Sequence, residues 1–219
     1  MLPSSRVLVS LFAAALIIPT DSYAFNSPLS EEAVREAYFL GQRRDETTAN
    51  FLEQYKQRLR EPETGPYVSS VEFLTPFALL VERSKDHSAG YSAQQAELDQ
   101  RSHEETLAIN IEVLFTESYG ALIQEPTGER SGAPIGFAFR PSDFWRDIDV
   151  QVMVKDKTVK RTRLTGEPLY FCSDGCSLVG ATLHLQFPAS AFDSDSATVQ
   201  VVPPEGPEVW VDFDLTTLR

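Results

Sequence analysis

The residues best suited to covalent chemistry are two cysteines, Cys172 and Cys176, in the sequence FCSDGCS. Asp-Gly is a turn signal, and a three-residue turn between extended segments would place the two thiols opposite each other at the neck of a hairpin. Thiols this close usually pair in an oxidising compartment. We predict a structural disulfide, because a metal site would need two further ligands and a redox site usually has the tighter Cys-x-x-Cys spacing.

Hydrolytic and metal chemistry has little support in the sequence. It contains no G-x-S-x-G, S-x-x-K or H-E-x-x-H motif and no phosphate-binding glycine loop. The run Asp86-His87-Ser88 holds the three residue types of a catalytic triad, but the side chains of adjacent residues diverge. We therefore assign no catalytic, cofactor-binding or metal-binding residue, and we expect no cofactor.

A tryptophan beside carboxylates is one candidate for ligand binding. Alternation places Trp210, Asp212 and Asp214 on one face of the last predicted strand, opposite its apolar residues. An exposed indole there could stack on a sugar ring while the carboxylates bind its hydroxyl groups. The alternative, which we favour, is that the N-terminal helices cover this face and bury Trp210.

Two long polar segments, 83–105 and 119–134, are the other candidate binding surfaces. They carry Tyr91 and Tyr119, whose side chains offer a large amphipathic contact area at low entropic cost. Ordinary solvent-exposed connections are the alternative for both segments.

A basic segment could contact an anionic partner. It holds five of the 19 Lys and Arg residues within nine positions: Lys155, Lys157, Lys160, Arg161 and Arg163. The alternative is that these charges lie on edge strands and discourage pairing with other chains.

Strands must position most of these residues, because the hydrophobic period changes from 3.6 to 2 beyond residue 66. Alternating apolar residues predict eight or nine strands, at 71–81, 107–115, 135–140, 150–154, after Asp156, and at 169–172, 183–187, 199–201 and 209–215. Thr75-Pro76 is taken as an interruption within the first of them. We predict an α+β, mainly β fold, in which residues 67–219 form an immunoglobulin-like antiparallel β-sandwich with a helical insertion near 92–102.

An N-terminal helical hairpin is predicted over residues 25–61. Ser30 can cap the first helix, and a second helical pattern runs through Phe51, Tyr55 and Leu59 until Pro62. Residues 62–66, Pro-Glu-Thr-Gly-Pro, have the composition of a linker. Helices this short are marginal alone, so we expect the aromatic stripe to dock on the sandwich, with a partner protein as the alternative.

The first 24 residues have the pattern of a secretory signal peptide. One arginine precedes a short apolar run at 7–18, and Ser22 and Ala24 place small residues at the cleavage-site positions. The apolar run is shorter than the ~20 residues that span a bilayer. We predict a secreted or periplasmic protein after cleavage following Ala24, with no stable membrane insertion afterwards.

The charge balance limits the partners. The chain has 19 Lys+Arg against 32 Asp+Glu, a net charge of −13, which repels nucleic-acid phosphates and anionic lipid at long range. We expect no nucleic-acid partner. We predict a non-enzymatic binding or protein-interaction module with a protein or carbohydrate partner, and we keep a carboxylate-based extracytoplasmic hydrolase and a carbohydrate-binding module as alternatives.

Overall fold

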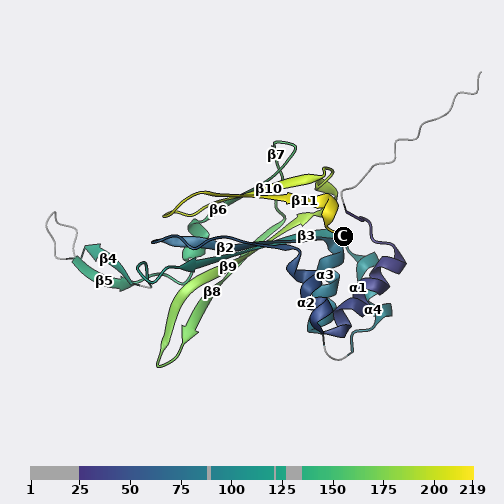
Figure 1. Cartoon of the computed structure of the whole chain (residues 1–219), viewed down its shortest axis with the longest axis horizontal. Helices are drawn as coiled ribbons and strands as arrows, with labels where there is room; N and C mark the ends of the chain where they lie inside the picture. The colour runs from purple at the N-terminus through teal and green to yellow at the C-terminus, as the bar shows by residue number, and fades with distance from the viewer. Residues whose placement is uncertain (1–24, 88–89, 121, 127–134) are drawn as a thin grey trace, which may run out of the picture.

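The structure is a computed structural model that describes residues 25–87, 90–120, 122–126 and 135–219. The predicted signal peptide lies outside the described residues. The described chain is an α+β fold in which two antiparallel sheets pack on each other, and four helices gather at one end of them (Figure 1). None of the helices in these ranges is long and apolar enough to cross a membrane.

Eleven strands form the sheets of the described chain, two more than the highest number predicted. The five-stranded sheet has the order β1 (Lys56–Arg58), β2 (Pro66–Leu74), β3 (Thr106–Phe115), β9 (Cys176–Pro188), β8 (Arg163–Cys172). The four-stranded sheet has the order β11 (Val209–Asp214), β10 (Ser196–Val202), β6 (Asp149–Val154), β7 (Lys157–Thr158). A separate hairpin pairs β4 (Leu122–Pro126) with β5 (Ile135–Phe139). The packed four- and five-stranded sheets are called the two-sheet body below.

The alternating residues predicted to face inward form the core between the two sheets. Phe73, Ile109 and Leu185 lie opposite one another on β2, β3 and β9, and each side chain is fully buried. The ring of Phe73 lies 5.3 Å from that of Phe213 on β11, so this residue joins the two sheets directly. Burial of these side chains fixes the register, because a slip of one residue would turn every apolar side chain outward.

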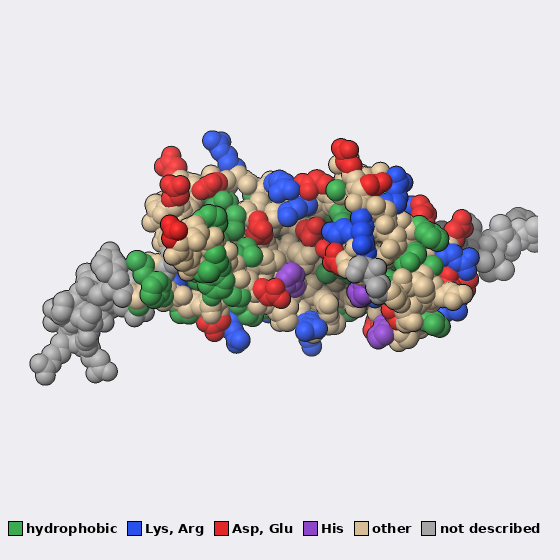
Figure 2. All heavy atoms as spheres, turned by 90° about the horizontal axis from the view of Figure 1, so that it is seen from below, with side chains coloured by type: hydrophobic (Ala, Val, Ile, Leu, Met, Phe, Trp, Pro, Cys, Tyr) green, Lys and Arg blue, Asp and Glu red, His purple; other side chains and the backbone are tan. Residues whose placement is uncertain are grey.

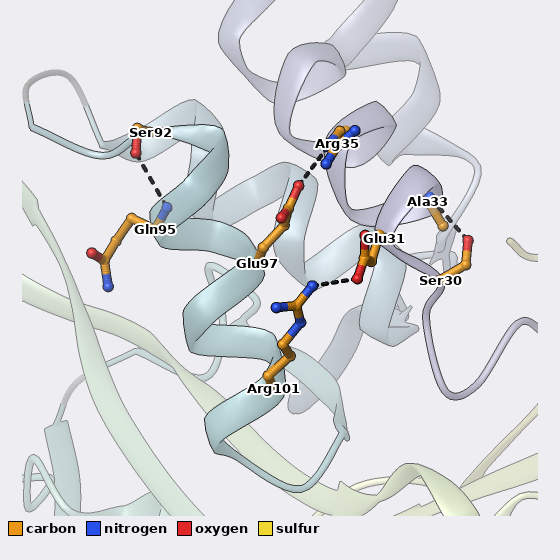
Figure 3. A network of polar contacts seen from close by, with 8 residues as sticks. All are labelled: Ser30, Glu31, Ala33, Arg35, Ser92, Gln95, Glu97 and Arg101. Carbon is orange, nitrogen blue, oxygen red and sulfur yellow. Dashed lines mark hydrogen bonds and ion pairs between the residues drawn. The ribbon is translucent and has the colours of Figure 1, made fainter.

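Four helices pack together as a small layer of their own: α1 (Glu31–Arg43), α2 (Glu46–Glu53), α3 (Pro76–Asp86) and α4 (Ala93–Ser102). Gly41 lets α1 approach α3 closely, since a Cβ there would collide with the backbone oxygen of Val81. Ser30 and Ser92 cap α1 and α4 as N-cap residues, and two ion pairs, Arg35–Glu97 and Arg101–Glu31, connect these helices (Figure 3). Helix α4 confirms the predicted helical insertion, and the Ser30 cap is confirmed as well.

The predicted strand at 71–81 is wrong beyond Leu74. The chain enters helix α3 there, because the side chain of Thr75 accepts a hydrogen bond from the Ala78 N–H at 3.3 Å and Pro76 occupies the first helical turn. Both residue types are favoured at a helix N-terminus. Thr75-Pro76 is therefore a helix start rather than an interruption in a strand.

The second N-terminal helix is also shorter than predicted. It ends at Glu53, and β1 follows as an edge strand on β2, with Gln57 opposite Val71. The Phe73 N–H donates to the Tyr55 oxygen at 2.9 Å and the Leu59 N–H to the Ser69 oxygen at 2.8 Å, so Leu59 lies beside the sheet and not on a helical stripe. Residues 62–65 of the predicted linker lie in the connection between β1 and β2, whereas Pro66 is already the first residue of β2.

The helical layer is fastened to the two-sheet body at Arg219. The hydroxyl of Tyr55 accepts from the Arg219 N–H at 3.0 Å and donates to the Arg219 backbone oxygen at 3.1 Å, and Thr75 donates to the same oxygen. The Arg219 guanidinium pairs with Glu36 on α1 and lies 4.3 Å from the ring centre of Phe77 on α3. We call these contacts the Arg219 clasp.

Candidate functional site

The two cysteines lie where the sequence predicted them, at the end of the β8–β9 hairpin. Cys172 ends β8 and Cys176 begins β9; they are the pair nearest the turn, and they form a disulfide. Ser173, Asp174 and Gly175 make the turn between them. The predicted structural disulfide is confirmed in the described chain, and it closes the end of this hairpin.

Aromatic side chains stand exposed directly before the disulfide. Tyr170 is 52% exposed and Phe171 is 65% exposed. Neighbouring residues of a strand point to opposite faces, so exposure of both means that neither face of the hairpin end packs on the body. Every residue from 170 to 177 is exposed, and the ribbon extends well away from the two-sheet body (Figure 1). We call residues 169–178 the β8–β9 arm.

The β4–β5 hairpin is a second projection that carries exposed apolar side chains. Leu122 and Phe139 lie directly opposite each other at the base of the hairpin and are both largely exposed. Part of the predicted loop at 119–134 is therefore strand β4, while residues 127–134 lie outside the described part. We call residues 122–126 with 135–139 the β4–β5 arm.

Both arms project from the end of the two-sheet body that is opposite the helices (Figure 1). Hydrophobic side chains gather over the β8–β9 hairpin and again near the base of the β4–β5 arm (Figure 2). Four of the seven large apolar residues exposed in the described chain lie on the arms: Leu122, Phe139, Tyr170 and Phe171. This end is the strongest candidate for a contact surface, because clustered exposed apolar groups mark interaction sites more often than scattered ones.

Tyr119 holds the base of the β4–β5 arm instead of pointing to solvent. Its hydroxyl donates to Glu205 at 2.5 Å, and the Arg140 guanidinium lies 4.1 Å from its ring centre. Burial raises the pKa of Tyr119 to about 12, and the hydrogen bond to Glu205 adds to the rise. These contacts join both ends of the arm to the loop between β10 and β11, so Tyr119 positions the arm.

Tyr91 also lies within a packed cluster. Its ring is 6.0 Å from that of Tyr38 and 5.0 Å from that of His87, and its backbone oxygen accepts from the Tyr38 hydroxyl at 3.0 Å. Burial raises the pKa of the Tyr91 hydroxyl. Tyr91 therefore packs the segment before α4 against helix α1 and the end of helix α3.

Trp210 is exposed, and the expectation that helices cover it is wrong. Its side chain is 55% exposed, because the helices pack at the end of the two-sheet body and not on the outer face of β11. Gln200 lies directly opposite on β10, and Gln151 lies opposite Gln200 on β6. The outer face of the four-stranded sheet thus presents an indole beside two amides.

The two carboxylates predicted beside Trp210 have different surroundings. Asp212 accepts from the Thr198 hydroxyl at 2.6 Å and stays exposed on the same sheet face. Asp214 accepts from the backbone N–H and the hydroxyl of Thr216, at 3.0 and 2.6 Å, and caps the short 3-10 helix Leu215–Thr217. Trp210 and Asp212 can therefore contact one ligand, whereas the Asp214 carboxylate is already used to cap the 3-10 helix that follows the strand.

A cleft of about 280 Å³ lies between α3, α4 and the start of β3. Its lining holds Asp99, His103, Glu104 and Glu105, the carboxylates and imidazole that a hydrolase would need. Glu105, however, accepts from the Leu29 N–H at 2.6 Å, from Gln100 and from Ser27, so it holds the N-terminal segment in place. The contacts of Glu105 are structural, and they leave Asp99 and Glu104 as the remaining acidic groups of the cleft.

His184 belongs to a polar row on the outer face of the five-stranded sheet. Its Nδ1 lies 2.9 Å from the Asn110 side-chain oxygen, and the Asn110 amide donates to Glu72 at 2.9 Å. Its outward position and this hydrogen bond make His184 a satisfied surface histidine. Among the described residues, no three His, Cys, Asp or Glu side chains are grouped so that they could hold a metal ion.

Comparison with known proteins adds no further assignment. No protein-family model matches the chain, and no curated protein resembles it in sequence.

Sequence reasoning missed the aromatic residues of the arms. The available signal was the run Leu169-Tyr170-Phe171, in which apolar residues occupy both faces of a strand directly before a disulfide turn. A strand with one buried face alternates apolar and polar residues, so a run on both faces indicates either full burial or a projecting contact element.

Proposed function

We propose that this protein is an exported binding protein that holds a protein partner with its two arms. The observation that carries the proposal is the exposure of two consecutive aromatic residues, Tyr170 and Phe171, on a disulfide-closed hairpin. A side chain of this size normally loses solvent contact when the chain folds. Leaving both in water is unfavourable unless a partner covers them.

The construction of the β8–β9 arm supports recognition of a protein surface. Aromatic side chains are enriched among the residues that dominate interface energies, where they fill apolar pockets of the partner. The disulfide limits the conformations of the hairpin end, which lowers the entropy lost on binding. We infer that the end of the hairpin, with Tyr170 and Phe171 on its two faces, inserts into an apolar groove of the partner, while the β4–β5 arm contacts the same partner beside it.

Site-specific photocrosslinking tests this function. A photoreactive phenylalanine analogue is placed at Phe171, and its adducts are identified in the extracytoplasmic fraction of the native host. The matched control carries the same analogue at Phe39, which is equally exposed on α1 at the other end of the molecule. We expect a defined adduct at position 171 that is missing at position 39.

Measured affinity for the crosslinked partner then decides the proposal. The double change Tyr170→Ser and Phe171→Ser should weaken binding by at least about tenfold, because two anchor residues of an interface typically contribute more than about 1 kcal/mol each. The change Phe39→Ser should leave the affinity unaltered. Adducts that are the same at both positions, or an affinity that is unchanged in the double variant, would remove the basis for an arm-mediated interaction.

Carbohydrate binding is a second candidate function, favoured by the exposure of Trp210. The indole, the Gln200 amide and the Asp212 carboxylate lie on one open sheet face and offer a stacking surface with hydrogen-bonding groups beside it. The carboxylates of this face favour a neutral sugar over an acidic one.

Affinity electrophoresis in gels containing soluble xylan or β-glucan tests this second function. Retardation of the wild-type protein, lost in Trp210→Ala, would support it. Tryptophan fluorescence gives an independent measure of sugar binding. The chain has two tryptophans, and the other one, Trp145, packs against Gly166, so a sugar stacked on the sheet face should change the emission of Trp210. Equal mobility of the two proteins in every gel would exclude this binding face for those polysaccharides.

Export of the protein belongs to the same proposal. Cleavage after Ala24 would yield a mature chain that begins at Phe25, and intact-mass measurement of the exported protein checks it. A full-length chain retained in the membrane fraction would contradict export.

We infer further that the two-sheet body is an immunoglobulin-like sandwich, on the basis of two antiparallel sheets whose inner faces pack together.

A further inference from the structure

One side of the two-sheet body carries a groove of about 450 Å³. On the opposite side the sheet edges are joined, because the Gln57 amide on β1 donates to the Asp212 backbone oxygen on β11 at 2.7 Å. The groove lies on the other side, where β7 and β8 are the edge strands, and its lining includes Gln151, Thr158, Val159, Lys160, Arg161 and Phe187. Its volume falls in the range of small-molecule sites.

Residues 159–162 form a short bridge between the two sheets, from β7 to β8, and the two basic side chains of the groove belong to this bridge. The Val159 N–H donates to the Val152 oxygen at 2.7 Å, and the Thr162 N–H donates to the Gln186 oxygen at 2.8 Å. Between these anchors, Arg161 donates to the Val150 oxygen at 3.1 Å. The bridge is therefore fixed at both ends, and Lys160 and Arg161 hold their backbone positions before any ligand binds.

These cations have no acidic partner in the described chain. Lys155 pairs with Asp193 at 3.1 Å, whereas Lys160 and Arg161 have no described carboxylate within 4.0 Å. Asp149, the acidic residue of the lining, accepts a hydrogen bond from Gln151 at 3.1 Å. A protein with a net charge of −13 thus keeps two uncompensated positive charges together at one groove.

Edge protection explains only part of the basic segment. Lys157 lies on β7 and Arg163 on β8, so their charges do discourage pairing at the two sheet edges. Lys160 and Arg161 lie on the bridge between these strands, where no sheet edge needs protection. Their position in the groove calls for a different explanation.

We propose that this groove binds a small sugar acid or sugar phosphate. Lys160 and Arg161 pair with the oxyanion, and arginine suits both carboxylate and phosphate because its guanidinium can donate two parallel hydrogen bonds. The Thr158 hydroxyl supplies a hydrogen-bonding group for a sugar hydroxyl, and the partly exposed Val159 side chain forms an apolar wall for the ring. This site is separate from the arms and does not depend on the function proposed for them.

Isothermal titration of the purified protein at low salt tests the site with four probes: glucuronate, glucose 6-phosphate, inorganic phosphate and glucose. We expect saturable binding of a sugar oxyanion and none of glucose, and the stronger of the first two probes identifies carboxylate or phosphate as the recognised group. Lys160→Gln and Arg161→Gln should each weaken binding at least about tenfold, since a charge-assisted hydrogen bond is lost.

Lys155→Gln is the matched control, because it removes the same charge five residues away but outside the groove lining. It should leave the affinity within about twofold, and Arg161→Lys serves as a charge-preserving variant if Arg161→Gln alters the circular dichroism spectrum. Three results would overturn the proposal: no saturable binding of any oxyanion, equal weakening by Lys155→Gln, or inorganic phosphate binding as tightly as both sugar anions.

Discussion

Replacing Tyr55 by phenylalanine isolates one hydrogen-bonded group of the Arg219 clasp. Tyr55 is 1% exposed, and its hydroxyl exchanges two hydrogen bonds with the Arg219 backbone. In Tyr55→Phe the ring still packs on Phe51, whose centre is 5.2 Å away. The Arg219 oxygen keeps the Thr75 hydroxyl as a donor, so the Arg219 N–H is the group that loses its partner.

The expected magnitude follows from that unsatisfied N–H. Arg219 is an exposed residue, so water can reach this N–H and the loss should be that of an ordinary hydrogen bond, about 0.5–1.5 kcal/mol; for a chain of this length Tm falls by roughly 2–4 °C for each kcal/mol. Tyr55→Ala also removes the ring and leaves a cavity between the helical layer and the two-sheet body, so it should cost roughly 3–5 kcal/mol. The two variants separate the polar contribution of the hydroxyl from the packing of the ring.

Equilibrium urea unfolding followed by far-UV circular dichroism measures both changes. Tyr170→Phe is the matched control, because the same hydroxyl is removed from an exposed tyrosine, and it should alter the free energy of unfolding by less than about 0.5 kcal/mol. A Tyr55→Phe variant as stable as the wild type would show that the clasp contributes no net stability. Equal losses in Tyr55→Phe and Tyr55→Ala would refute the importance assigned to ring packing.

Three further predictions concern the disulfide, the close contact of Gly166 with Trp145, and the ion pair of the Arg219 clasp. Changing Cys172 and Cys176 to serine should lower the free energy of unfolding by at most about 2 kcal/mol, because the closed loop is short; thermal denaturation checks this, and two free thiols titrating in the native wild type would contradict the disulfide. Gly166→Ala should cost about 1–3 kcal/mol, since the new Cβ would collide with the Trp145 ring, and an unchanged Tm would contradict that close packing. The hydrogen bond from Arg219 holds the pKa of Glu36 below its usual 4.5. The Glu36 carboxylate therefore stabilises the fold above pH 4.5, and this contribution is lost as the pH falls through the lowered pKa. The Tm of Glu36→Gln should fall less on acidification than the Tm of the wild type, and parallel curves of Tm against pH would contradict this.

Several elements could be predicted from the sequence because their signals are local. Strict alternation of apolar residues specified β3 and the central part of β9, since a strand that buries one face needs apolar side chains at every second position. Ser30 marked the start of α1 through a hydrogen bond within one helical turn. The disulfide followed from two cysteines and a turn between them, a geometry confined to five residues.

Other elements depended on contacts between residues far apart in the sequence. Residues 77–81 carry apolar side chains at a spacing that fits a strand, and the packing of Phe77 and Val81 against α1 favours the helix. Strand β1 has the sequence Lys-Gln-Arg, with no apolar pattern, and it forms because the edge of β2 supplies hydrogen-bond partners. For α3 the local signal was limited to the helix start at Thr75-Pro76, whereas strand β1 cannot be derived from a short window of residues at all.

The sequence by itself determined which residues of β11 share a face, since alternation along a strand is a local property. Only the tertiary structure decided that Trp210 stays exposed, because that depends on where the helices dock. The same holds for Tyr170 and Phe171, and for Lys160 and Arg161 in the groove. Alternation along a strand sets the direction in which a side chain points. Whether that side chain is exposed depends on the packing of helices and strands that are distant in the sequence.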